Sequence, residues 1–444
     1  MRTLALALLI LAAPAATALG QAPAPGAPGT DDASPARVLG LDEAVRTARE
    51  RQPALRSARA GTEAARARSD LARAPLLPQL DARATYGRAT GNMPPSAGGT
   101  ASSSWDTGGS WLFGATLYQL VWDFGQSTGR FRAAREGAAA QQEAERSTAL
   151  DVLLDVRSAF FTARAARDLV TVARETLANQ EAHLRQVQGF VEVGTRPEID
   201  LAQARTDRAN AEVQLIVAEN AYVVAKARLN QAMGVEGSTD YRVADDALPP
   251  VEGEDGPLEA LVAEALRVRP DLAALEAARR AQEATVSSAR GGYLPTLGVQ
   301  TGLTEAGPEL DSMAWNWSAS ATLGWNLFGG GATRAEVREA RAGLDAVDAE
   351  ADALRQSVRL EVDSARLALR ATKSALGAAE EALLNARERL RLAEGRYQAG
   401  AGSLLELSDA QVALTSAGAQ RVRAEYELAS ARAELLRALG RDGG

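Results

Sequence analysis

A tandem repeat constrains the fold of this 444-residue chain more than any other feature of its sequence. The stretch LDEAVRTARERQPALRSARAGTEAARARSDLARAPLLPQL, which starts at residue 41, aligns without a gap on LEALVAEALRVRPDLAALEAARRAQEATVSSARGGYLPTL, which starts at residue 258. Matches continue later in both copies, at Gly194 and Gly400, at Leu201 and Leu407, and between LNQAMG (229–234) and LLRALG (435–440). One unit of about two hundred residues therefore occurs twice, at 41–235 and 258–441, and the two copies are expected to share one architecture.

Three segments lie outside the repeated units. Residues 1–20 combine an early arginine, an apolar run too short to span a bilayer, and small residues that allow cleavage after position 18 or 20. This is the pattern of an export signal peptide. Residues 21–40, rich in Pro, Ala and Gly, are expected to be a flexible N-terminus, and the acidic stretch 236–257 is expected to be a linker. We therefore predict a protein that leaves the cytoplasm.

Composition excludes several classes of function. The chain has no cysteine, which rules out disulfides, thiolate metal sites, a cysteine nucleophile and a lipid anchor on an N-terminal cysteine. Its net charge of −8 argues against nucleic acid as a partner. The only histidine, His183, stands among polar residues and is expected on a solvated helix face, and Asp245 and Asp246 are expected on the solvated surface. With no Ser–His pair and no cluster of metal ligands, no cofactor is expected, and an exported hydrolase is the weakest alternative.

Four segments alternate between apolar and polar residues, which is the period of a β-strand with one face in each environment. They cover about 79–90, 109–122, 296–305 and 314–327, and all six tryptophans of the chain lie in or beside them. A β-sandwich face would explain the alternation but not the tryptophans at strand ends, which are typical of a transmembrane β-barrel. The tryptophans expected at the membrane interface are Trp111, Trp122, Trp315, Trp317 and Trp325.

Four strands are too few to close a barrel, because about eight are needed before side chains even fill the interior. An open sheet edge is not tolerated in lipid, so the outer strands must pair with another chain. Copies of the same chain are the natural partners, and three copies would supply twelve strands. We therefore infer an α+β membrane protein that forms a homotrimer around a 12-stranded β-barrel.

Long helices make up most of each unit. Proline is absent from 127–191, and one helix over this range would reach roughly 97 Å. The expected long helices are 127–191, 197–233, 331–397 and 403–439, and each unit begins with two short helices that break at a proline. From Leu344 to Tyr397, apolar residues recur at steps of three and four, which is the spacing of a coiled coil. Gly400 and Gly402 fall where one long helix stops and the next begins, so we expect a helical hairpin with a glycine-dependent turn.

These features together resemble the TolC family of outer membrane efflux proteins. The resemblance is carried by the tandem repeat, by YLP (293–295), by Gln119, Phe124-Gly125 and Phe328-Gly329 at strand ends, and by the hairpins VGTRPEIDLAQAR and YQAGAGSLLELSDAQ. It covers nearly everything after residue 40. It implies a homotrimer in the bacterial outer membrane, with a 12-stranded β-barrel in lipid and a 12-helix α-barrel that extends into the periplasm. It also implies a periplasmic adaptor (membrane fusion) protein and an inner-membrane transporter as partners, for drug efflux, metal efflux or type I protein secretion.

The resemblance places the loops and turns of the chain. Residues 91–109 and 305–313 would face the outside of the cell, and the two hairpin turns would form the periplasmic tip. The turn residues that would contact the adaptor are Gly194, Thr195, Gly400, Ala401 and Gly402.

In the resembled family the tip is also the gate, and acidic residues just past the turns ring its constriction. The matching positions are Asp200, Glu406 and Asp409, which would favour cations. A local explanation stands beside this one: Ser403 and Glu406 have the spacing of a capping box, and Asp200 lies in a first helical turn, where the helix dipole favours it. Asp409 has no such local explanation.

The family also closes its tip with a latch between a tyrosine and an arginine. Tyr397 matches the tyrosine, but Gly402 stands at the arginine position, so Arg196 of the other hairpin is the candidate substitute.

The main alternative is a soluble periplasmic coiled-coil protein, such as an adaptor or a scaffold. It explains the export signal and the heptads, but not four alternating strands that carry all the tryptophan.

Overall fold

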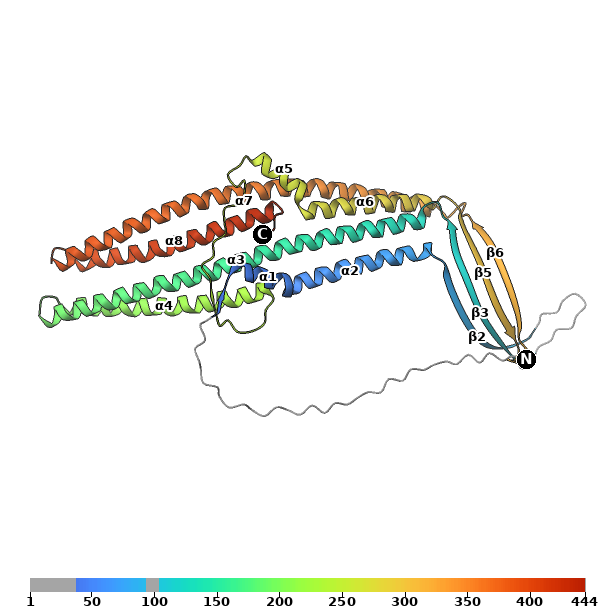
Figure 1. Cartoon of the computed structure of the whole chain (residues 1–444), viewed down its shortest axis with the longest axis horizontal. Helices are drawn as coiled ribbons and strands as arrows, with labels where there is room; N and C mark the ends of the chain where they lie inside the picture. The colour runs from blue at the N-terminus through green and yellow to red at the C-terminus, as the bar shows by residue number, and fades with distance from the viewer. Residues whose placement is uncertain (1–36, 93–103, 444) are drawn as a thin grey trace, which may run out of the picture.

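The computed structural model describes residues 37–92 and 104–443, which form an elongated set of long helices with a four-stranded sheet at one end (Figure 1). The expected export signal, most of the expected flexible N-terminus and much of the loop at 91–109 lie outside the described residues. None of the described helices combines the length and the apolarity that a membrane-crossing helix needs.

The two sequence units have the same order of elements. The first contains α1 (Leu41–Arg51), α2 (Pro53–Arg73), the 3-10 turn η1 (Ala74–Leu76), β2 (Gln79–Thr90), β3 (Thr107–Trp122), α3 (Gln126–Glu192) and α4 (Glu198–Met233). The second contains α5 (Leu258–Val268), α6 (Pro270–Gly291), β5 (Thr296–Gly307), β6 (Ala314–Gly324), α7 (Ala332–Gln398) and α8 (Leu404–Ala438). The helices α3 and α7 have 67 residues each, which corresponds to about 100 Å.

Coiled-coil packing holds each hairpin together, α3 with α4 and α7 with α8 (Figure 1). The seam predicted along α7 is confirmed, because every one of its positions from Leu344 to Tyr397 is buried or half-buried. Val358, Val362 and Leu369 have no exposed surface at all. The apolar step of three and four therefore translates directly into the face that α7 turns toward its neighbours.

In both units the second short helix (α2 or α6) meets the end of the second long helix (α4 or α8), and a side-chain hydrogen bond connects them. In the first unit the amide of Gln52 donates to the carbonyl of Ala232, at the end of α4, at 2.7 Å. In the second unit Arg269, which aligns with Gln52, donates to the carbonyl of Ala438, at the end of α8, at 3.2 Å. The side chain just before the proline thus caps free helix carbonyls, so that α2 continues the line of α4, and α6 that of α8.

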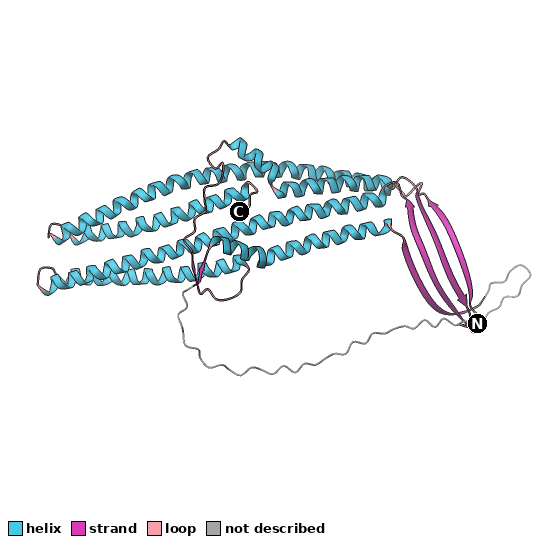
Figure 2. Ribbon diagram, in the orientation of Figure 1, coloured by secondary structure: helices cyan, strands magenta, loops and turns pink. Residues whose placement is uncertain are grey.

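The sheet is antiparallel throughout, in the order β2-β3-β5-β6 (Figure 2). The strand predicted at 314–327 is too long, because β6 ends at Gly324, opposite Thr296 at the start of β5. The residue before β5 is Pro295, which has no backbone N–H and therefore cannot extend the hydrogen bonds between β5 and β6. Trp325 lies just beyond the strand and donates its indole N–H to the carbonyl of Tyr293 at 3.1 Å.

A β-bulge changes the orientation of the last tryptophan of β3. Trp111 and Trp122 are an odd number of residues apart, so simple alternation would place them on opposite faces. The register between β3 and β5 shifts between Leu120 and Trp122, which adds one residue to β3. Trp122 then lies opposite Leu297 and on the same face as Trp111, at the other end of the strand.

The expectation of a flexible N-terminus over 21–40 is wrong at Arg37–Leu39, and the linker 236–257 packs on the helices. Residues Arg37–Leu39 form β1, which pairs in parallel with β4 (Tyr241–Val243) of the linker. The linker residues Val243, Leu248 and Val251 are buried, and their burial in the core holds the segment in place. The linker is therefore ordered against the helices, which its acidic, Pro/Gly-rich composition did not indicate.

The two linker aspartates are also more than solvated surface. Asp246 accepts the N–H of Leu41 at 2.7 Å and so caps the start of α1. Asp245 accepts from Arg164 at 2.8 Å and from Arg167 at 3.2 Å. Burial by itself would raise the pKa of Asp245, but these two guanidinium groups bring it below its usual value.

Candidate gate at the helical tip

The turns of the two hairpins lie at the same end of the molecule, opposite the sheet (Figure 1). Each turn is a Schellman motif. In the first, Gly194 has a φ of 73°, its N–H donates to Val191, and the N–H of Thr195 donates to Phe190. In the second, Gly400 has a φ of 71° and the same two hydrogen bonds run from Gly400 to Tyr397 and from Ala401 to Arg396. The repeat thus builds two matching turns side by side.

Gly402 is needed for a different reason from Gly400. Its φ is not in the left-handed region, but a Cβ at this position would lie 3.0 Å from the backbone nitrogen of Tyr397 and 3.1 Å from the carbonyl carbon of Arg396. The chain therefore folds back so tightly that only glycine fits without a shift of the backbone. The expectation that both glycines serve the turn stands, with closeness rather than left-handed freedom as the cause at Gly402.

Tyr397 joins the two hairpins at the tip. Its side chain comes from α7 and is 2% exposed, with its hydroxyl buried and without a hydrogen-bond partner among the described residues. The guanidinium of Arg196, in the turn of the other hairpin, lies 4.7 Å from the centre of its ring. This geometry allows a cation–π contact. The structure thus places together the two residues named for the latch.

The expectation that His183 lies on a solvated face is wrong. Its side chain, from α3, is 6% exposed, and its ring centre lies 5.7 Å from that of Tyr397. The polar neighbours along the sequence point elsewhere, because residues next to each other on a helix face different directions. The ring centre of Phe190 lies 6.3 Å from that of Tyr397. Sequence reasoning missed both contacts, although His183 stands four residues before the buried Val187 and so shares its face of α3.

Only part of the acidic set is free to act in a constriction. Ser403 accepts the N–H of Glu406 at 3.1 Å, so the helix cap is present. The carboxylate of Glu406 does not complete a capping box, because it pairs instead with Arg396 at 3.1 Å. Asp409 is exposed and Asp200 half-exposed, both in the first turns past the hairpin bends. Sequence reasoning missed this pairing, although the position of Arg396 ten residues before Glu406, across a tight turn, was an available signal.

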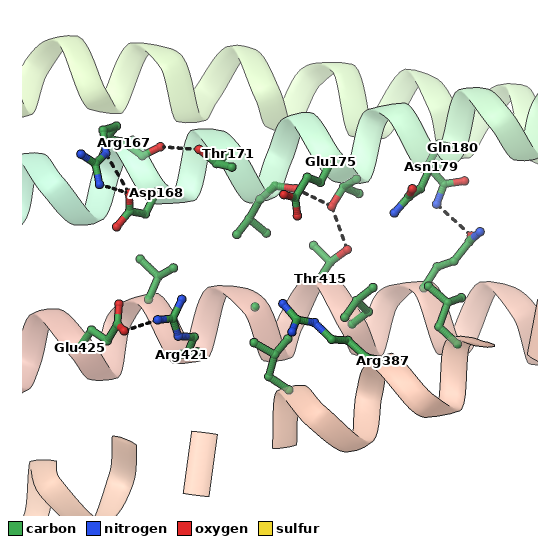
Figure 3. A pocket seen from close by; sticks show the side chains of 18 of the residues that line it. Arg167, Asp168, Thr171, Glu175, Asn179, Gln180, Arg387, Thr415, Arg421 and Glu425 are labelled. Atoms are coloured by element: carbon green, nitrogen blue, oxygen red, sulfur yellow. Dashed lines mark hydrogen bonds and ion pairs between the residues drawn. The ribbon is translucent and has the colours of Figure 1, made fainter. Parts of the chain in front are cut away.

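Part of the contact between the hairpins, around Thr176 and Gln180 of α3, is polar. The hydroxyls of Thr176 and Thr415 lie 3.0 Å apart, and the amide of Gln180 donates to Gln411 at 3.1 Å (Figure 3). A cavity of about 350 Å³ separates α3 from α7 and α8 beside these bonds, and Arg387 points into it (Figure 3). Elsewhere the two hairpins share one apolar core, which includes Val156 and Phe160 of α3 and Leu435 of α8. In the described part of the chain, no group of His, Asp or Glu is arranged to hold a metal ion.

Comparison with known proteins agrees with this architecture. Residues 44–235 and 261–441, nearly the two repeated units, match the sequence model of a family described as outer membrane efflux protein. The chain is 30% identical over 414 residues to Protein CyaE of Bordetella pertussis, which covers 91% of this chain and 85% of that protein. It is 26% identical over 410 residues to a probable efflux pump outer membrane protein, SepC of Pseudomonas putida, covering 90% and 83%.

A solved structure shows the same fold. The Campylobacter jejuni CmeC outer membrane channel superposes with a TM-score of 0.79 at 20% identity, covering 90% of this chain and 85% of that one.

Proposed function

The chain belongs to the outer membrane efflux protein family, and from this premise we propose that three copies close into one channel gated at the helical tip. The protein is an exit duct of the outer membrane that extends into the periplasm. Family membership also argues against a soluble adaptor or scaffold, which would not explain a sheet with tryptophans at its ends.

The main support for the trimer is that the outermost strands and the outermost helices of the chain each have a neighbour on one side only. In the sheet, β2 and β6 each have one neighbour among the described strands, and they run antiparallel to each other. In the half of the helical part that ends at the tip, the order is α7-α8-α3-α4, so α7 and α4 stand at the two edges there. A ring of copies would join β6 to the β2 of the next copy and α7 to its α4, and twelve strands would make a closed barrel with no free edge.

The edge helices support this closure because both carry large apolar side chains that are exposed in the single chain. On α4 the side chains of Val213, Ile216 and Val217 are each about 60% exposed. On α7 the same holds for Leu360 and Leu384, at 69% and 67%. An aqueous surface rarely carries such stripes on two helices unless a partner covers them.

The aromatic residues support the placement of the sheet in the membrane. Trp111 packs on Tyr86 with ring centres 4.6 Å apart, and both lie at the loop end together with Trp315 and Trp317. Trp122 and Trp325 lie at the helix end. The distance from Trp111 to Trp122 is roughly 36 Å along the strand, or roughly 28 Å in height at a tilt of about 40°, which matches the hydrocarbon layer.

At the tip, we assign the constriction to Asp200 and Asp409 of each copy, with Glu406 neutralised by Arg396. The contact of Arg196 with Tyr397 would hold the two hairpins together in the closed state. We further propose that an adaptor protein engages the tip, linking the duct to an inner-membrane transporter. The residues offered to it are the turn residues Gly194, Thr195, Gly400, Ala401 and Gly402, all of which reach the surface.

Cysteine pairs across the proposed β6–β2 contact would test the assembly. The chain has no cysteine of its own, so introduced pairs stand alone. We would combine Ala82→Cys or Ala84→Cys on β2 with Ala319→Cys or Ala321→Cys on β6. Within one chain the two strands are three strand spacings apart, about 14 Å, which is too far for a disulfide. Oxidation in the outer membrane should therefore give dimers and trimers on a denaturing gel and no larger species.

The matched controls are the single-cysteine variants, which should stay monomeric on the same gel. Monomers with all four pairs, or a ladder beyond the trimer, would contradict the closed ring of three.

A further inference from the structure

His183 occupies an unusual place for the only histidine of a chain. It is 94% buried where the two hairpins meet, one contact away from the latch. Its Nδ1 is buried and has no hydrogen-bond partner within the described residues, and the same is true of the hydroxyl of Tyr397. Two unsatisfied polar groups therefore face a contact that would otherwise be apolar, with Leu407 and Ala410 of α8 in the same cluster.

The charges around His183 come from three sides. The helix α4 presents Asp200 and Asp207, whose negative charges favour the imidazolium. The turn of the first hairpin presents Arg196, which already lies on the ring of Tyr397. A protonated His183 would thus place a second cation beside the same ring. On its own helix, Glu181 is engaged with Arg208 of α4 at 3.7 Å.

We propose that His183 makes the gate sensitive to protons, so that its protonation weakens the Tyr397 contact and favours the open tip in acid. This inference rests on the proposed function of the tip. A neutral imidazole has one N–H donor and one acceptor nitrogen, whereas the imidazolium has two N–H donors and no acceptor. In the closed tip the N–H on Nδ1 would have no acceptor, and the charge would lie on a side chain that is only 6% exposed. Both costs disappear when α7 moves away from α3.

The sign of the effect follows from linkage. Burial lowers the pKa of His183 in the closed tip, and Asp207 and Asp200 offset only part of that decrease. In an open tip that hydrates the imidazole, the pKa returns toward its ordinary value near 6.5. Protons therefore bind more tightly to the open state, and the closed state loses population as the pH falls through about 6.5. Each unit of difference between the two pKa values changes the open-to-closed ratio by about tenfold at each His183.

The test is the conductance of the tag-free protein in planar bilayers at pH 7.5, 6.5 and 5.0. The wild type should open about tenfold more often at pH 5.0 than at pH 7.5. His183→Phe, which keeps a ring against Tyr397 but cannot be charged, should give the same low conductance at every pH. The matched control is His183→Phe combined with Ala182→His, which restores a histidine on an exposed position of the same turn and should not restore the response.

A second measurement does not depend on any variant. Because His183 is the only histidine, ¹³C-labelled histidine in the wild-type protein gives one titrating NMR signal. A pKa below 6.5 in the closed protein supports the inference, whereas a pKa at or above 6.5 overturns it. An unchanged pH response in His183→Phe also overturns it and leaves the channel intact. Absence of conductance in every protein at every pH would overturn the proposed channel itself, and this inference with it.

Discussion

At the scale of single residues, the tip shows how neighbours decide what a carboxylate does. Glu406 and Asp409 are one helical turn apart and have the same chemistry, but Arg396 pairs with Glu406 alone. The serine cap holds the backbone of Glu406 where that arginine reaches it. The local explanation and the pore explanation are therefore separable, and Asp409 is the better candidate for contact with passing ions.

We predict that Asp409→Asn reduces the preference of the channel for cations severalfold, because three negative charges leave the constriction. Glu406→Gln, the matched control one turn away, should change the preference much less, because Arg396 already balances Glu406 in the ground state. Reversal potentials under a salt gradient in planar bilayers measure both. Equal effects of the two substitutions would show that Arg396 does not shield Glu406.

The latch gives a second prediction at this scale. Arg196→Ala removes the cation from the ring of Tyr397, a contact worth about 1–2 kcal/mol where it is partly desolvated. Because three such contacts would open together, the closed state should lose stability and the basal conductance should rise at least tenfold. Arg185→Ala, an exposed arginine of the same hairpin, serves as the control and should leave conductance unchanged. A conductance unaltered by Arg196→Ala would exclude this arginine from the latch.

At the scale of elements, the two joints between helices show one solution realised with different chemistry. Gly234 and Gly440 both have positive φ and lie against the residue before the proline of the opposing helix. In the first unit that residue is the neutral Gln52, whereas in the second it is Arg269, which is 3% exposed and bonded to Asp271 and Glu361. Burial by itself would raise the pKa of Asp271, but Arg269 brings it below its usual value.

Truncation of the two joints should therefore have unequal costs. Arg269→Ala leaves Asp271 without its guanidinium partner and leaves Glu361 with Arg437 alone, and we expect a loss of about 3 kcal/mol. Gln52→Ala loses one neutral hydrogen bond and should cost about 1 kcal/mol. Thermal unfolding of the detergent-solubilised proteins, followed by circular dichroism, compares them. A similar shift of the midpoint for both would mean that the charge network adds nothing to the joint.

At the scale of the whole molecule, the orientation of the sheet decides which side chains meet lipid. The bulge in β3 brings Trp122 onto the face of Trp111, and β6 adds Trp315 and Trp317 to that face. The other face of β6 carries only small polar residues and glycine, from Asn316 to Gly324. A closed barrel would turn the aromatic face outward and the polar face toward the lumen.

Adjacent residues of β6 provide the matching test. Ala319→Arg would place a charge on the lipid face near the middle of the strand, at a cost of about 2–4 kcal/mol. Ser320→Arg would point into the aqueous lumen and should be tolerated. The amount of folded trimer recovered from outer membranes distinguishes them. Recovery that falls for Ser320→Arg and not for Ala319→Arg would reverse the assignment of the two faces.

Much of this architecture was predictable because it follows from periodic patterns. Apolar residues at steps of three and four located the seam of α7, and alternation of apolar and polar residues located the strands. The repeat predicted the same order of helices and strands in both units. Patterns failed where a contact joins distant segments. The polar neighbours of His183 gave no sign of Tyr397, the composition of the linker gave no sign of β4, and simple alternation could not reveal the bulge before Trp122. In each case the deciding partner lies more than one hundred residues away in sequence.

The sequence by itself determined the two-fold repeat, the long coiled-coil hairpins, the glycine turns and the four strands, because each depends on residues close together along the chain. Only the tertiary structure decided that Arg196 lies on Tyr397 and that His183 is buried beside them. The physical reason is that the direction of a side chain across a helix interface depends on how two hairpins pack. No period within either hairpin specifies that packing.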